Sequence, residues 1–116
     1  MKTILLLFIL LGGALGGVSC KDEPPGKGAT AELGYAFANP IAAKLETFFR
    51  QHGNYPVDLA VVAPDYKIQK PVQIDFGYKQ LESGRAYDMY FAYRGPGMNV
   101  CHYTSAEKKW RCSGAY

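Results

Sequence analysis

Residues 72–93, VQIDFGYKQLESGRAYDMYFAY, decide the fold of this chain. In both halves of the stretch, apolar residues alternate with polar or small ones, which is the period-two pattern of a half-buried strand that here begins at Val72. A two-residue turn at Ser83 and Gly84 would join the halves into a hairpin. The pairs that then face each other are all apolar and share one face: Tyr78 with Met89, Phe76 with Phe91, and Ile74 with Tyr93. The stretch therefore predicts an antiparallel hairpin with one apolar face.

The carboxy-terminal segment predicts a second hairpin. A turn centred on Ala106 and Glu107 places Cys101 opposite Cys112, with Tyr103 and Trp110 paired on the same face. We expect Cys101 and Cys112 to form a disulfide, with Cα atoms in the usual range of ~4.4–6.8 Å. The spacing of the two cysteines differs from the Cys-x-x-Cys of redox proteins, which favours a structural role over a redox role.

An amphipathic helix is predicted over residues 31–52. Its apolar residues recur at helical spacing and form one stripe: Leu33, Phe37, Ala38, Ile41, Leu45, Phe48 and Phe49. Pro40 either kinks this helix or begins it, with Asn39 as the N-cap. Gly53 is expected to end it, after His52 in the last turn. Between this helix and the first hairpin, residues 57–62 have room for one short helical turn before Pro64. The predicted fold is α+β, with one helix packed on a four-stranded antiparallel sheet.

The segment KLETFFRQHGNYPVDLAVVAPDY, residues 44–66, resembles the region that follows the long helix in type IV pilins and in the major pseudopilins of type II secretion. The sharpest motif is His52-Gly53-Asn54-Tyr55-Pro56 after an apolar helix. The resemblance covers residues 30–116 and implies a pilin-like globular head with a carboxy-terminal cysteine pair. The chain departs from pilins at its start, because it lacks their long apolar helix and their leader. The resemblance therefore concerns the head alone.

The first twenty residues, MKTILLLFILLGGALGGVSC, indicate export. A cation at Lys2, an apolar run at residues 4–11 and small residues after it are typical of a cleaved signal peptide. The ending Gly17-Val18-Ser19-Cys20 resembles a bacterial lipobox, although Gly17 stands where an aliphatic residue is usual. This implies that Cys20 is lipidated and that residues 1–19 are removed. The alternative is an ordinary signal peptide, cut after Ser19 or Gly16.

The order of segments predicts three parts. Residues 1–19 form the signal peptide, 20–29 a flexible stalk rich in charge and proline, and 30–116 the pilin-like α+β domain. Lipidation of Cys20 would also account for the odd number of cysteines. By resemblance to the sorting rule of enterobacterial lipoproteins, Lys21 after the lipidated cysteine favours the outer membrane. We expect a location in the bacterial cell envelope, on the lipid anchor and facing the periplasm.

Composition and motifs argue against several function classes. The formal net charge is +3 and the cations form no run, so no nucleic-acid partner is expected. We find no phosphate loop, metal-ligand spacing or nucleophile motif, and therefore expect no catalytic residues, no metal, no cofactor and no small-molecule substrate. His52 is explained by its place at a helix end.

The function expected from the sequence is that of a non-enzymatic envelope lipoprotein with a membrane anchor, acting as a structural or protein-interaction module. His102, Lys109 and Arg111 fall on the outward face of the second hairpin and form a small basic patch for an acidic protein partner. The alternative is a small periplasmic inhibitor or immunity lipoprotein that blocks an enzyme with an exposed loop. Residues 95–99, GPGMN, would be that loop.

Overall fold

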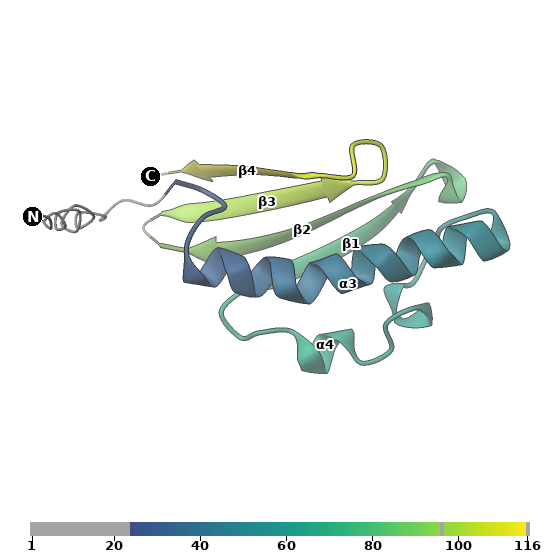
Figure 1. Cartoon of the computed structure of the whole chain (residues 1–116), viewed down its shortest axis with the longest axis horizontal. Helices are drawn as coiled ribbons and strands as arrows, with labels where there is room; N and C mark the ends of the chain where they lie inside the picture. The colour runs from purple at the N-terminus through teal and green to yellow at the C-terminus, as the bar shows by residue number, and fades with distance from the viewer. Residues whose placement is uncertain (1–23, 96, 116) are drawn as a thin grey trace, which may run out of the picture.

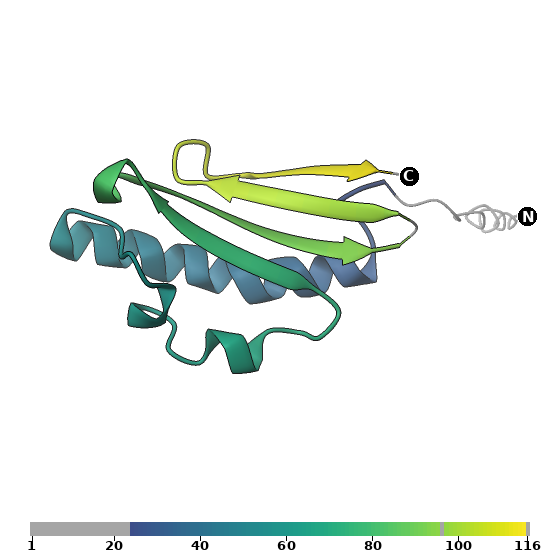
Figure 2. The same ribbon diagram turned by 180° about the vertical axis from the view of Figure 1, so that it is seen from behind.

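The computed structural model describes residues 24–95 and 97–115, which form an α+β domain of one long helix packed on a four-stranded antiparallel sheet (Figure 1). In chain order the elements are α3 (Ala29–His52), η3 (Leu59–Val61), α4 (Tyr66–Gln69), β1 (Asp75–Leu81), η4 (Glu82–Gly84), β2 (Ala86–Arg94), β3 (Met98–Thr104) and β4 (Trp110–Ala115). The strands lie in the order β1-β2-β3-β4, and α3 runs along one face of the sheet (Figures 1 and 2). The predicted fold class is confirmed.

Helix α3 passes through Pro40 without ending, so the alternative in which the helix begins at that proline is wrong. A proline removes one backbone hydrogen bond, here to the carbonyl of Ala36. Burial of apolar residues on both sides of Pro40 offsets that cost: Ala31, Ala38, Ile41 and Leu45. Gly53 ends the helix as expected, in the left-handed conformation (φ 80°), and its N–H donates to Phe49 O over 2.8 Å.

The amino-terminal half of α3 contacts the sheet through small residues. Gly34 is buried, and a Cβ atom at this position would overlap the ring of Phe91. Leu33, which the apolar stripe placed against the core, is instead 39% exposed. The small face of Ala31, Gly34 and Ala38 turns toward the sheet because it lets the helix approach the aromatic rings closely.

The register of the first hairpin is confirmed at Phe76–Phe91 and Tyr78–Met89. The connection differs from the predicted two-residue turn, because strand pairing ends at Leu81–Ala86 and leaves a four-residue loop. In that loop η4 is held by a contact with the segment after α3, since Tyr55 N donates to Gly84 O over 2.8 Å. The predicted two-residue turn and the observed four-residue loop have the same centre, so the strand register is the one predicted.

The predicted start of the first strand is wrong. Strand β1 begins at Asp75, and Val72 is 90% exposed. Ile74 lies before the strand but is buried, and its N–H donates to Pro71 O over 3.3 Å. A turn therefore occupies residues 71–74 where an extended chain was expected.

The register of the second hairpin is confirmed, with Cys101 opposite Cys112, His102 opposite Arg111 and Tyr103 opposite Trp110. The two cysteines form the expected disulfide. Their Cα atoms are 4.0 Å apart. This is closer than the expected range, and closer than the ~4.5–5.5 Å usual for residues directly opposite each other on antiparallel strands.

The segment between α3 and β1 covers one flank of the helix. The expected short turn within residues 57–62 is η3, where Asp58 Oδ1 accepts from Ala60 N over 2.9 Å. Helix α4 follows, a single turn that the sequence pattern did not indicate. Leu59 and Ala63 are buried and fix this segment to the core.

Residues 24–28 belong to the stretch predicted to be a flexible stalk, yet they contact the domain. Gly26 is buried, and its N–H donates to Tyr93 Oη over 2.9 Å. Tyr35 Oη donates to Gly26 O over 2.8 Å. The chain is thus attached to the sheet before α3 begins at Ala29. Residues 20–23 and the predicted signal peptide lie outside the described residues.

We predict that replacing both Cys101 and Cys112 with serine lowers the melting temperature by several degrees. The disulfide joins residues eleven apart in sequence. Closing so short a loop stabilises a small domain by ~2–3 kcal/mol. Thermal unfolding followed by circular dichroism measures the difference, and wild type treated with a reductant should shift in the same direction. Equal melting temperatures for the variant and untreated wild type would contradict a stabilising role.

Candidate functional site

The three residues predicted to bind a partner gather around the hairpin of β3 and β4. His102 and Arg111 face each other in the register, on the side of the sheet opposite the buried Cys101. Lys109 lies in the connection just before β4 and is exposed. Helix α3 covers the other face of the sheet (Figures 1 and 2). Among the elements described, none covers the face that carries His102 and Arg111.

Acidic side chains accompany two of these three residues. His102 Nδ1 lies 3.2 Å from Asp88 Oδ1 of β2. Arg111 Nε donates to Glu107 Oε1 over 2.6 Å, four residues back across the turn. The predicted basic patch is therefore a surface of mixed charge, which we call the outer hairpin face and define as Asp88, His102, Glu107, Lys109 and Arg111.

The contact between Asp88 and His102 on this surface was not predicted from the sequence. In the register Asp88 lies opposite Thr104 and Tyr90 lies opposite His102. His102 thus reaches Asp88 along the diagonal of the sheet, and its ring lies tilted against Tyr90 with centroids 5.8 Å apart. The signal was the placement of Asp88 and Tyr90 on the outward face of β2, but the pairing of β2 with β3 was needed to find it.

The ion pair at the turn affects the titration of its acid. The hydrogen bond from Arg111, assisted by the charges of Arg111 and Lys109, lowers the pKa of Glu107 below its ordinary value. The same hydrogen bond raises the pKa of Arg111. At neutral pH both groups are charged, and the side chains remain 63% and 40% exposed for Arg111 and Glu107. The pair can therefore exchange contacts with a charged partner.

On the inner face of the sheet, tyrosines and one carboxylate form a second polar cluster. Tyr55 Oη donates to Glu46 Oε2 over 2.9 Å, and Lys108 Nζ lies 3.6 Å from the same oxygen. Tyr87 is fully buried, and within the described residues its hydroxyl has no hydrogen-bond partner. Burial raises the pKa of Tyr87, and it raises the pKa of Tyr78 to about 12. Through Glu46 and Lys108, the cluster joins α3 to the β3–β4 turn. Its phenols stay neutral near pH 7 and are therefore unsuited to proton transfer at that pH.

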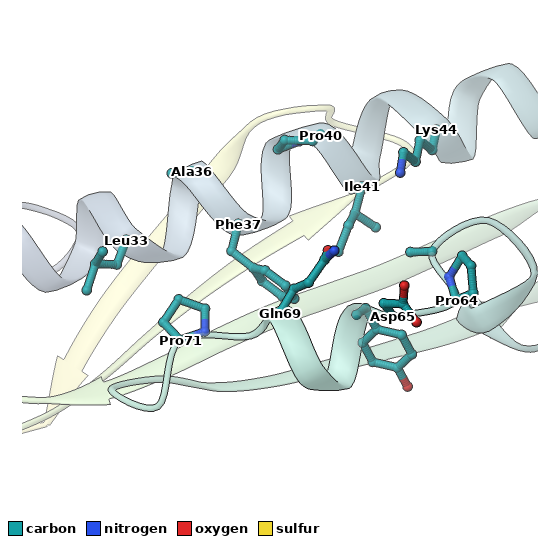
Figure 3. A pocket seen from close by; sticks show the side chains of 12 residues that line it. Leu33, Ala36, Phe37, Pro40, Ile41, Lys44, Pro64, Asp65, Gln69 and Pro71 are labelled. Carbon is teal, nitrogen blue, oxygen red and sulfur yellow. The ribbon is translucent and has the colours of Figure 1, made fainter.

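A groove of about 500 Å³ lies between α3 and the segment that contains α4 (Figure 3). Three polar residues, Lys44, Asp65 and Gln69, contribute to its walls. The other lining residues are largely apolar: Leu33, Ala36, Phe37, Pro40, Ile41, Ala63, Pro64, Tyr66 and Pro71. Near it, Val61 and Ile68 are 60% and 84% exposed. This groove offers contact surface, and its charged lining residues are Lys44 and Asp65. It could not be predicted from the sequence, because it depends on how the chain folds back beside α3.

The loop considered for enzyme inhibition, residues 95–99, includes Pro96, which lies outside the described residues. It joins β2 to β3 at the end of the domain where the amino-terminal segment enters (Figure 1). Asn99 is buried, and its Nδ2 donates to Gly95 O over 3.2 Å. Met98 is 37% exposed. This hydrogen bond joins the start of the loop to β3.

Residues 24–95 and 97–115 contain neither a candidate metal site nor a helix that could span a membrane. In that range no three side chains of His, Cys, Asp or Glu are grouped so that they could hold a metal ion. No helix in the same range combines the length and hydropathy needed to cross a bilayer. The predicted lipidation site, Cys20, lies outside the described residues.

Comparison with protein families, with characterised proteins and with solved structures finds no match to this chain.

We predict that Arg111→Gln raises the pKa of Glu107 toward its ordinary value. The hydrogen bond and positive charge that favour the carboxylate would be removed. In the wild type the ion pair is intact at neutral pH and is lost as the pH falls through the lowered pKa of Glu107. A pH titration of the Glu107 carboxyl carbon by NMR measures both values. Lys44→Gln, on the helix, is a matched control that should leave the pKa unchanged, and an unchanged value in Arg111→Gln would contradict the ion pair.

Proposed function

We propose that this protein is a non-enzymatic lipoprotein of the bacterial cell envelope that presents its domain to a protein partner. The outer hairpin face is the proposed contact surface. The observation that carries the proposal is its exposed, mixed-charge character on the side of the sheet opposite α3. Elsewhere in the described chain, Cys101 and Cys112 are bonded to each other, and the hydroxyl of Tyr55 is hydrogen-bonded to Glu46.

The chemistry of the outer hairpin face describes the partner it would fit. Arg111 and Lys109 can meet carboxylates, while Asp88 and Glu107 can meet cations, so a partner surface of mixed and complementary charge is favoured over a uniformly acidic one. Such exposed pairs contribute little affinity by themselves. They select orientation and accelerate encounter, and binding should weaken as salt is added.

The order of elements supports the likeness to a pilin-type head. One long helix ends at Gly53, a short helical turn follows at η3, and an antiparallel sheet with a disulfide completes the chain. In this proposal a lipid at Cys20 takes the place of the long apolar helix of pilins. The protein would then act as a single membrane-bound head, and assembly into a filament is not part of the proposal.

We predict that Cys20→Ser moves the protein from the membrane fraction to the soluble periplasmic fraction. The thiol of Cys20 is the proposed site of acylation, and several acyl chains on one residue anchor a protein stably. Cell fractionation with immunoblotting measures the distribution. A periplasmic, soluble wild type would contradict the lipid anchor, and so would a Cys20→Ser variant that remains in the membrane.

We predict that changing both Lys109 and Arg111 to glutamate reduces capture of the partner from detergent-solubilised envelopes. The substitutions reverse two charges on the outer hairpin face and remove the ion pair with Glu107. Lys67→Glu together with Lys44→Glu is the matched control, because it makes the same charge change on the flank of α3 and α4. Quantitative mass spectrometry of affinity-purified samples compares the three proteins. Retention of the same proteins by the outer-face variant would remove this face from consideration.

A further inference from the structure

The end of the domain where the amino-terminal segment enters has a composition suited to a lipid surface. We propose that this end, which we call the anchor end and define as Lys27, Val72, Arg94 and Met98 with the hollow between them, rests on the phospholipid bilayer and fixes the orientation of the domain. The inference rests on the proposed lipid anchor at Cys20 and adds which surface faces the membrane.

The contacts of Gly26 limit how far the domain can move from its anchor. Gly26 is bound on one side by Tyr93 Oη at 2.9 Å and on the other by Tyr35 Oη at 2.8 Å. A Cβ atom at this residue would come within 2.7 Å of Cys112 Sγ, and its φ is +85°, so the tight fit depends on glycine. Cys20 is six residues earlier in the sequence. A chain of that length spans at most ~20–22 Å, because each residue covers at most ~3.3–3.6 Å.

Because this connection is short, the two ends of the domain lie at different distances from the proposed anchor. Helix α3 contains 24 residues and is therefore about 36 Å long at 1.5 Å per residue. Its first residue lies just after Gly26, whereas the β3–β4 turn lies toward the other end of the sheet (Figures 1 and 2). The anchor end is thus held within reach of the headgroup layer, and the opposite end extends a helix length away from it.

The side chains of the anchor end fit that layer. A hollow of about 420 Å³ brings together residues from four segments: Thr30, Val72, Gln73, Ile74, Asp75, Ala92, Tyr93, Arg94 and Met98. Among these residues Val72 is 90% exposed and Met98 is 37% exposed, and Arg94 is exposed as well. Lys27 follows Gly26 in the chain and is also exposed. Exposed apolar side chains next to cations are typical of protein surfaces that lie in the headgroup region of a bilayer, where lipid phosphates attract the cations.

Acidic residues at this end argue against an interaction driven by charge alone. Asp75 lines the hollow and Glu32 lies in the first turn of α3, so the local net charge is close to zero. We therefore assign the orientation chiefly to the short connection to Cys20 and the exposed apolar side chains. The bilayer is favoured over a second protein here because the connection brings the membrane to this surface.

The test uses the full-length lipoprotein, purified from membranes and reconstituted in vesicles of phosphatidylcholine and phosphatidylglycerol. Tryptophan is introduced at the anchor end in Met98→Trp and, as a second variant away from the core, in Val72→Trp. Val61→Trp is the matched control, because Val61 is also an exposed apolar residue and lies beyond the anchor end. The native Trp110 is present in every sample. A nitroxide on the lipid headgroup should quench the added fluorescence of Met98→Trp and Val72→Trp at least about twice as strongly as that of Val61→Trp, since groups in contact with the interface lie within ~5–10 Å of the label.

Two other measurements separate the possible failures. Vesicle flotation is recorded on the same samples: protein that does not float contradicts the anchor at Cys20 and the orientation with it, whereas protein that floats with equal quenching at all three positions overturns the orientation alone. Gly26→Val should detach residues 24–28 from the sheet and reduce the difference in quenching between Met98→Trp and Val61→Trp. An unchanged difference in that background would overturn the role assigned to Gly26.

Discussion

The close contact between Gly34 of α3 and the ring of Phe91 in β2 determines how helix and sheet fit together. Phe91 is fully buried and lies opposite Phe76 on one side and Cys101 on the other, so it links three strands. Its ring meets Tyr35 and Trp110 edge to face, with centroids 5.4 and 5.1 Å apart. Only a residue without a side chain leaves room for this ring beneath the helix. Larger residues at position 34 would push α3 away from the sheet and open the aromatic core.

Several other features depend on that fit. Because α3 lies close to the sheet, Asn39 Oδ1 accepts from Trp110 Nε1 over 2.9 Å and holds the start of β4. Tyr35, one residue after Gly34, reaches both Gly26 O and Cys112 Sγ. The position of the amino-terminal segment and the environment of the disulfide thus follow from the same helix contact. A proposed anchor and a proposed partner face are connected through one compact core.

The strand registers could be predicted from the sequence because one face of each hairpin is buried. Shifting a strand by one residue would turn Phe76 and Tyr78 outward, so the alternation permits one register. The Cys101–Cys112 pair carried the same information for the second hairpin. Helix α3 was predictable through Pro40 because the apolar stripe keeps its phase there.

What could not be predicted depends on contacts between segments distant in sequence. The loop at residues 82–85 is held by Tyr55, which lies well before it in the chain. Asp88 meets His102 only because β2 and β3 pair in a particular register. The groove beside α3 and the attachment of Gly26 likewise depend on the folded core. Local propensity carries no signal for such contacts, which explains why the basic patch was predicted without Asp88.

The proposed anchor also limits where a partner can be. A connection of at most ~22 Å followed by a helix ~36 Å long places the far end of α3 within roughly 60 Å of the membrane surface. The outer hairpin face extends toward the end of the sheet that lies away from Gly26, where the β3–β4 turn carries Glu107 and Lys109. A partner that meets this face would therefore contact the side of the domain, in the aqueous phase above the bilayer. Exposed charge pairs suit that geometry, because at an ionic strength near 0.15 M they act over about 8 Å and so guide a partner only in the last step of its approach. Stable binding would then require apolar contact in addition to these charge pairs.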